Sequence, residues 1–175
     1  MRRFAPALLL LGLPACGSET QAPEPPPDPT GAGAALEKSA IARGVIPDPD
    51  SIEPEGRFER RSDLGTDKFC AVGAGDDRYR IGILASFGPG STCEGQGEAR
   101  PDGDGFALRF EEAEGCELHA SFDGDELRID GAVPEACSAL CDSRASLAGT
   151  SYYLVEPGAK AARRTVGAQV ERLCE

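Results

Sequence analysis

The sequence lacks an apolar run of the roughly 20 residues that a membrane-spanning helix needs. It is also short of bases, since 18 Lys and Arg stand against 30 Asp and Glu for a net charge of −12. Nucleic-acid phosphates require clustered Lys and Arg, so we exclude a nucleic acid as a partner. The same shortage argues against docking on anionic lipid through a basic patch.

Histidine is equally scarce, because His119 is the only one in the chain. A Ser-His-Asp or Cys-His arrangement would have to be built around it, and no Gly-x-Ser-x-Gly elbow accompanies it. Its alternating neighbours Glu117 and Ser121 place it on the polar face of a predicted strand, where an exposed histidine needs no catalytic role. We therefore predict no catalytic residue and no cofactor, and a hydrolase is the less favoured alternative.

Two acidic segments suggest cation binding. The run Asp102–Gly105 has the Asp-x-Asp-Gly opening of a calcium loop, and Asp123, Asp125 and Glu126 form a second acidic turn. A strand is expected to resume directly after Gly105, which leaves no room for a twelve-residue calcium loop. Tight hairpin turns use the same residue types, so we interpret both segments as turns and predict no metal site.

The first fifteen residues have the layout of a secretory signal. A cationic start with Arg2 and Arg3 precedes a short apolar run, and the small residue Ala15 precedes Cys16. Removal of residues 1–15 would leave 16 bases and 30 acids, so the mature chain would be more acidic still. Such a charge favours solubility and a basic partner.

The segment Leu13-Pro14-Ala15-Cys16 resembles the lipobox of bacterial lipoproteins, in which the cysteine becomes the lipidated first residue. Pro14 departs from the small or β-branched residue usual at its position. The resemblance implies a membrane anchor on Cys16, held by more than one acyl chain. Gly17, in place of aspartate, implies the outer membrane, with the protein facing the periplasm.

Six further cysteines remain once Cys16 is assigned to lipid. An even number in an oxidising compartment predicts three disulfides, although six cysteines allow 15 pairings and the sequence does not choose among them. A zinc site at Cys137 and Cys141 is the alternative, but no second pair or nearby histidine completes a ligand set. The six cysteines are Cys70, Cys93, Cys116, Cys137, Cys141 and Cys174.

The rest of the chain divides into three parts. Residues 16–35 form a proline-rich tether with no large apolar side chains, and residues 36–55 contain a short helix over Leu36–Val45 and a linker. Residues 56–175 form one disulfide-bonded β domain. Within it we predict a helical turn over Pro134–Leu140 and a helix over Ala159–Arg164.

Apolar and polar residues alternate through much of this domain, with Gly, Pro and Asp between the alternating runs. Such a pattern predicts short, half-buried antiparallel strands. We expect a mainly all-β fold: a small antiparallel meander closed into a barrel or a sandwich, with short flanking helices and disulfides. The expected strands cover Tyr79–Phe87, Phe106–Glu111, Cys116–Asp123, Leu127–Ile129, Thr150–Val155 and a terminal strand at Val170–Cys174.

Two further resemblances concern function. Residues 40–49 and 144–149, with the cysteine layout, resemble an uncharacterised family of small Gram-negative envelope lipoproteins, which implies a β-rich domain and no known activity. Ser146, Gly149 and Tyr152 resemble the serine–glycine–tyrosine loop of periplasmic lysozyme inhibitors. The second inhibitor motif has no counterpart here, and a turn into a strand with Tyr152 packed inward explains the same residues.

The expected function is therefore that of a periplasm-facing binding or interaction module of the cell envelope. Its partners would be the membrane, through the lipid, and a basic envelope protein. Inhibition of a muralytic enzyme is the main alternative, and a hydrolase or a purely structural protein is less favoured. A wide apolar barrel mouth would instead favour a small-ligand carrier.

Overall fold

The computed structural model describes residues 31–43, 45, 53–142 and 144–175. The predicted signal segment, Cys16 and most of the predicted tether lie outside the described residues. Among the helices of the described part of the chain, none has both the length and the apolar character needed to cross a membrane.

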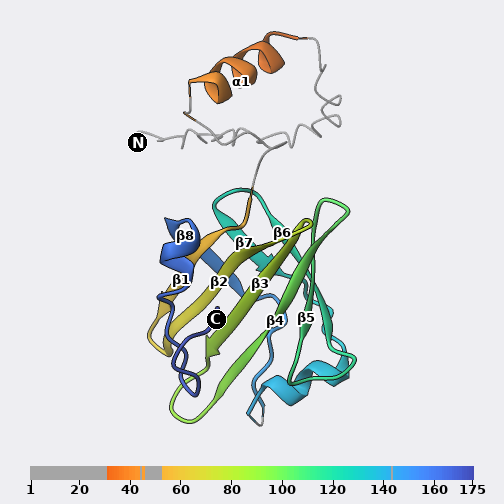
Figure 1. The fold of residues 1–175 in the computed structure, drawn as a ribbon, viewed down its shortest axis with the longest axis vertical. Coiled ribbons are helices and arrows are strands. Elements are labelled where there is room, and N and C mark those ends of the chain that lie inside the picture. The colour runs from red at the N-terminus through yellow and green to blue at the C-terminus, as the bar shows by residue number, and fades with distance from the viewer. Residues whose placement is uncertain (1–30, 44, 46–52, 143) are drawn as a thin grey trace, which may run out of the picture.

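Eight antiparallel strands form a closed barrel, in which each strand pairs with the next and β8 returns to β1 (Figure 1). The predicted mainly all-β meander is confirmed, and its closure is a barrel rather than a sandwich. The strands are β1 (Gly56–Ser62), β2 (Gly65–Gly75), β3 (Arg78–Ser86), β4 (Thr92–Asp102), β5 (Gly105–Phe110), β6 (Glu117–Phe122), β7 (Glu126–Ile129) and β8 (Ser151–Pro157).

In the described part of the chain, three short helices accompany the barrel. α1 (Ala32–Ala42) precedes the barrel and overlaps the helix predicted over Leu36–Val45. The 3₁₀ helix η2 (Glu135–Leu140) and α2 (Ala159–Ala162) lie where helices were predicted. The predicted terminal strand at Val170–Cys174 is wrong. That segment is irregular and lies against the outside of the barrel, because its apolar residues pack onto an existing sheet instead of extending it.

The interior of the barrel is a packed core. Alternate residues of each strand point inward, and the largest of them are almost completely buried. Phe58 contacts Phe69 and Phe122 edge to face, with ring centroids 5.5 and 5.7 Å apart. The fully buried side chains from the strands include Phe58, Phe69, Ile81, Ile83, Leu108, Leu118, Leu127, Ile129 and Tyr152. Side chains thus fill the space that a ligand-carrying barrel would leave open.

The long connection between β7 and β8, described over residues 130–142 and 144–150, packs into this core at one end of the barrel. Leu140 of η2 and Leu147 are buried in the main apolar cluster. Two disulfides, Cys93–Cys141 and Cys116–Cys137, fasten the connection to β4 and to the segment before β6. A third, Cys70–Cys174, fastens the C-terminus to β2, so the prediction of three disulfides is confirmed.

The C-terminal residues 163–175, here called the C-terminal arm, cover the outer face of β2 and β3 (Figure 1). Leu173 and Cys174 of the arm pack with Val72 and Leu84 of the strands in a second apolar cluster. Gly82 of β3 lies directly beneath the arm, since a Cβ at that position would stand 2.2 Å from the carbonyl oxygen of Leu173.

Polar contacts from β4 complete the attachment of the arm. The carboxylate of Glu94 accepts hydrogen bonds from three successive backbone N–H groups, those of residues 168–170. The side-chain amide of Gln96 donates to the carbonyl oxygens of Arg172 and Leu173 at 2.9 and 3.0 Å. The outer face of β2, β3 and the start of β4 is therefore occupied by the chain itself.

Candidate functional site

The outer face of β5 and β6, with the part of β4 that follows Gln96, lies beyond the contacts of the arm and carries exposed polar side chains. The strand register places Glu98 of β4 beside Arg109 of β5, and Arg109 beside Glu117 of β6. Further along the same face, Ala107 of β5 stands between Arg100 and His119. Charged side chains from three strands therefore gather on one surface.

This face is hollowed into a groove that follows β5. A cavity of about 520 Å³ begins near the β4–β5 turn, and a second of about 360 Å³ shares Arg109, Phe110 and Glu117 with it. The second cavity continues to Gly115 and Cys116. We call the two together the β5 groove. Its larger part is lined by Glu98, Arg100, Pro101, Asp102, Ala107, Arg109, Phe110, Glu111 and Glu117.

The two arginines of the β5 groove already have acidic partners. Arg109 donates to Glu117, and Arg100 lies 3.7 Å from Glu98. Among the residues that the structure describes, Asp102 and Glu111 take part in no ion pair. The groove therefore presents carboxylates whose negative charge is not neutralised by ion pairs within the described chain.

Charge is distributed unequally over the whole barrel. Residues 92–142, from β4 to just beyond η2, carry 14 acids and three bases. Residues 53–91 and 144–175, which form β1–β3, β8 and the arm, carry ten acids and eleven bases. The excess negative charge of the domain thus lies on the half that contains the β5 groove.

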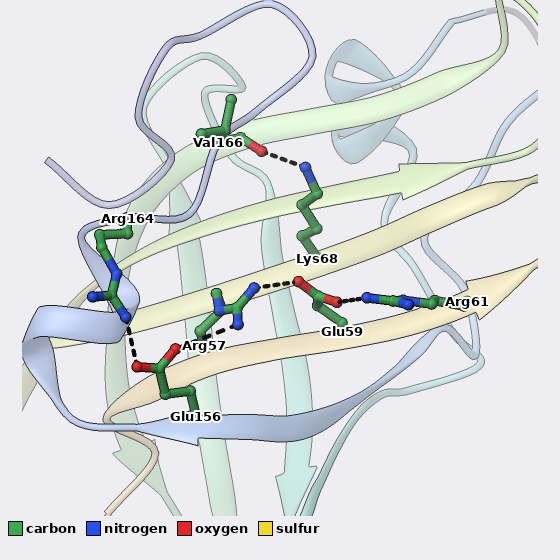
Figure 2. A network of polar contacts seen from close by, with 7 residues as sticks. All are labelled: Arg57, Glu59, Arg61, Lys68, Glu156, Arg164 and Val166. Carbon is green, nitrogen blue, oxygen red and sulfur yellow. Dashed lines mark hydrogen bonds and ion pairs between the residues drawn. The ribbon is translucent and has the colours of Figure 1, made fainter.

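The other half uses several of its bases in contacts within the chain. Figure 2 shows Arg57 of β1 between Glu59, at 2.6 Å, and Glu156 of β8, at 3.3 Å. Arg164 of the arm pairs with the same Glu156, and Lys68 of β2 donates to the carbonyl oxygen of Val166 at 2.8 Å. These contacts link β1, β2 and β8 to the arm.

His119 stands at the β6 edge of the acidic face and is partly exposed. Its Nδ1 lies 3.2 Å from a carboxylate oxygen of Asp130, and its Nε2 lies 3.4 Å from the backbone oxygen of Asp102. The ring covers Gly105, where a Cβ would stand 3.0 Å from it. Both ring nitrogens face oxygen acceptors, and no hydroxyl or thiol of the described chain hydrogen-bonds to them. This arrangement connects strands, and it lacks the nucleophile that a catalytic triad needs.

The acidic segments form turns, as the sequence interpretation expected. Asp123 accepts the N–H groups of Asp125 and Glu126 at 3.0 and 2.8 Å, and these hydrogen bonds lower the pKa of the Asp123 carboxyl. Gly103 has a φ of +61°, which suits the first residue of the two-residue hairpin between β4 and β5. Across the described residues, no three His, Cys, Asp or Glu side chains converge as metal ligands would.

The candidate interaction residues Ser146, Gly149 and Tyr152 do not share one surface. Tyr152 is fully buried inside the barrel, 3.2 Å from the hydroxyl of Thr150, and burial raises the pKa of its phenol well above the ordinary value. Ser146 and Gly149 are exposed in the turn that precedes β8, while Leu147 between them packs into the core. Only the turn is accessible in this conformation.

Neither a protein-family model, nor a curated protein, nor a solved structure matches this chain. Function is therefore inferred from the barrel's own residues. The β5 groove was missed by sequence analysis because it depends on the pairing of β4 with β5, and β4 was not predicted. The one available signal was the excess of acids between residues 92 and 142.

Proposed function

We propose that this protein is a lipoprotein of the bacterial cell envelope whose barrel binds a basic protein on the periplasmic side of the outer membrane. The anchor would be the lipid on Cys16, implied by the lipobox-like segment that precedes it. The observation that carries the binding role is the acidic, uncovered and concave face over β4–β6. Three disulfides suit an oxidising compartment such as the periplasm.

The build of the barrel favours binding over chemistry. A closed sheet, a filled interior and three disulfides hold the outer face in one shape, so a partner need not order it on binding. Complementary charge would speed association with a basic partner, and this gain would fall as salt rises. His119 has a structural part in this face, since its ring contacts the backbone at the end of β4 and so joins β6 to the β4–β5 turn.

The anchor is tested by expressing the wild type and Cys16→Ser in a Gram-negative host. We expect the wild type in the outer-membrane fraction, with an intact mass that includes the acyl chains and lacks residues 1–15. The Cys16→Ser protein should appear in the soluble periplasmic fraction. A wild type that remains unprocessed or free of lipid would overturn the proposed anchor.

The partner is tested by chemical crosslinking in intact cells, followed by mass spectrometry of the crosslinked peptides. Basic envelope proteins should be captured through residues of β4–β6, and capture should weaken when the salt of the medium is raised. Capture of only acidic or neutral proteins, or crosslinks confined to the arm, would contradict the proposed partner class.

Inhibition of a basic, lysozyme-type muralytic enzyme is a second candidate. The acidic face favours it, because the charges of inhibitor and enzyme would be complementary. The exposed turn at Ser146 and Gly149 would be the inhibitor-like element. Titration of the Cys16→Ser protein into a lysozyme assay tests this candidate. Full activity at a large excess of the protein would eliminate it while leaving the binding role intact.

A further inference from the structure

The β5 groove has two kinds of lining. Ala107 and Pro101 supply exposed apolar surface above the buried Phe110, while acidic side chains from β4, from β6 and from the loop after β5 stand around them. Lys and Arg side chains have the matching build, with an aliphatic stem that packs on apolar surface and a charged end that reaches outward. The acidic residues of the groove are Glu98, Asp102, Glu111 and Glu117.

The shape of the groove favours an extended chain. Its two cavities adjoin at Arg109 and together run along β5 into the loop before β6. Six residues of strand span roughly 20 Å, so an occupant that follows β5 would be about as long as an extended peptide of six residues. A single cation would leave most of this length empty, and the described acids do not converge as metal ligands do.

We propose that the β5 groove binds an extended Lys- or Arg-rich segment of a polypeptide partner. This inference rests on the proposed function and names the chemistry of the partner at that site. Asp102 and Glu111, near the two ends of β5, take the cationic side chains, because these carboxylates have no ion-pair partner in the described chain. Arg109 and Glu117 pair with each other at the centre, so this part of the groove offers a cation no unpaired carboxylate.

The test uses the full chain carrying Cys16→Ser and a synthetic hexa-arginine peptide, with binding followed by calorimetry at about 0.15 M salt. Asp102→Asn with Glu111→Gln removes two groove charges and breaks no described ion pair. The matched control is Asp63→Asn with Asp77→Asn, in the β1–β2 and β2–β3 turns, which removes the same charge away from the groove and likewise breaks no described ion pair. Asp77 has positive φ, a backbone conformation that asparagine tolerates.

We expect the groove variant to bind the peptide roughly three- to tenfold more weakly, and the control variant less than about twofold more weakly. Amide shifts on titration should be centred on residues 107–111. Equal weakening in both variants would show attraction by net charge alone and would overturn the groove. An absence of saturable binding by the unmodified groove would overturn it as well.

The two proposals fail in different ways. If hexa-arginine occupies the groove but crosslinking in cells captures no basic protein, the proposed function fails and the groove's specificity stands. If a basic protein is captured equally well by the wild type and the groove variant, the proposed function stands and the groove is overturned as its binding site.

Discussion

Asp67 shows how a single polar residue is accommodated in this barrel. Its side chain lies on the inner face of β2, only 8% exposed, and Oδ1 accepts the backbone N–H of Ser86 at 2.7 Å. Burial raises the pKa of the Asp67 carboxyl, and this effect exceeds the opposing effects of that hydrogen bond and of Arg60. The folded state therefore binds this proton more tightly than the unfolded state does.

Replacement of Asp67 by asparagine should stabilise the protein at pH 7. The amide side chain would keep an acceptor for the Ser86 N–H and remove a buried charge, so we expect a gain on the order of 1 kcal/mol in the free energy of unfolding. Because the wild-type pKa is raised, the gain is present above that pKa. The gain shrinks as the pH falls through the raised pKa, and it disappears below the ordinary aspartate pKa of 3.8. Urea unfolding of both proteins at pH 7, 5 and 3.5 measures this, and a gain that grew toward low pH would contradict it.

At the scale of elements, the attachment of the C-terminal arm depends on a glycine. Gly82→Ala would place a methyl group 2.2 Å from the Leu173 carbonyl oxygen and 2.7 Å from its carbon, which are backbone atoms that cannot rotate away. We expect a loss of roughly 1–3 kcal/mol in the free energy of unfolding, as for other overpacked sites. Hydrogen exchange should also accelerate at the arm amides held by Glu94.

Gly131→Ala is the matched control for this substitution. A methyl group added at Gly131 would have no atom within 4 Å, and the residue has no positive φ. Alanine there should therefore change the free energy of unfolding by less than about 0.5 kcal/mol. If Gly82→Ala were as stable as Gly131→Ala, with unchanged exchange in the arm, the close contact between β3 and the arm would not be a constraint.

The strands that sequence analysis predicted are those with large inward side chains. β5, β6 and β8 were recognised because residues such as Phe106, Leu118 and Tyr152 alternate with polar ones. β4 was missed because its inward positions are small. Gly95 is one of them, and a Cβ there would meet Leu140 of η2 at 2.8 Å. The space inside β4 is filled from elsewhere in the chain, which no local pattern reveals.

β2 was missed for the opposite reason. Its run from Phe69 to Val72 is buried on both faces, because the inward residues meet the core and the outward ones meet the arm. An alternation of apolar and polar residues is expected only where one face contacts solvent. The β5 groove could not be predicted either, because its acids come from separate strands that only the register brings together.

At the scale of the whole molecule, the three disulfides join parts of the chain that differ widely in sequence separation. Cys70–Cys174 closes 104 residues, Cys93–Cys141 closes 48 and Cys116–Cys137 closes 21. The entropy that each crosslink removes from the unfolded chain grows with the length of the loop. A chain-entropy model gives about 4.7, 4.1 and 3.3 kcal/mol respectively.

The three disulfides differ less in burial than in the length of the loops that they close. Five of the six cysteines are at most 3% exposed, so replacement of any pair by alanine removes a similar amount of buried sulfur. We therefore expect the loss of stability to follow loop length, greatest for Cys70→Ala with Cys174→Ala and least for Cys116→Ala with Cys137→Ala. Urea unfolding of the three double variants, with the other two disulfides intact, measures this order. The order depends on the arm unfolding together with the barrel, as its contacts with Glu94 and Gln96 predict. If the arm detached on its own, loss of the Cys70–Cys174 disulfide would no longer be the most destabilising. The barrel would then unfold independently of that crosslink.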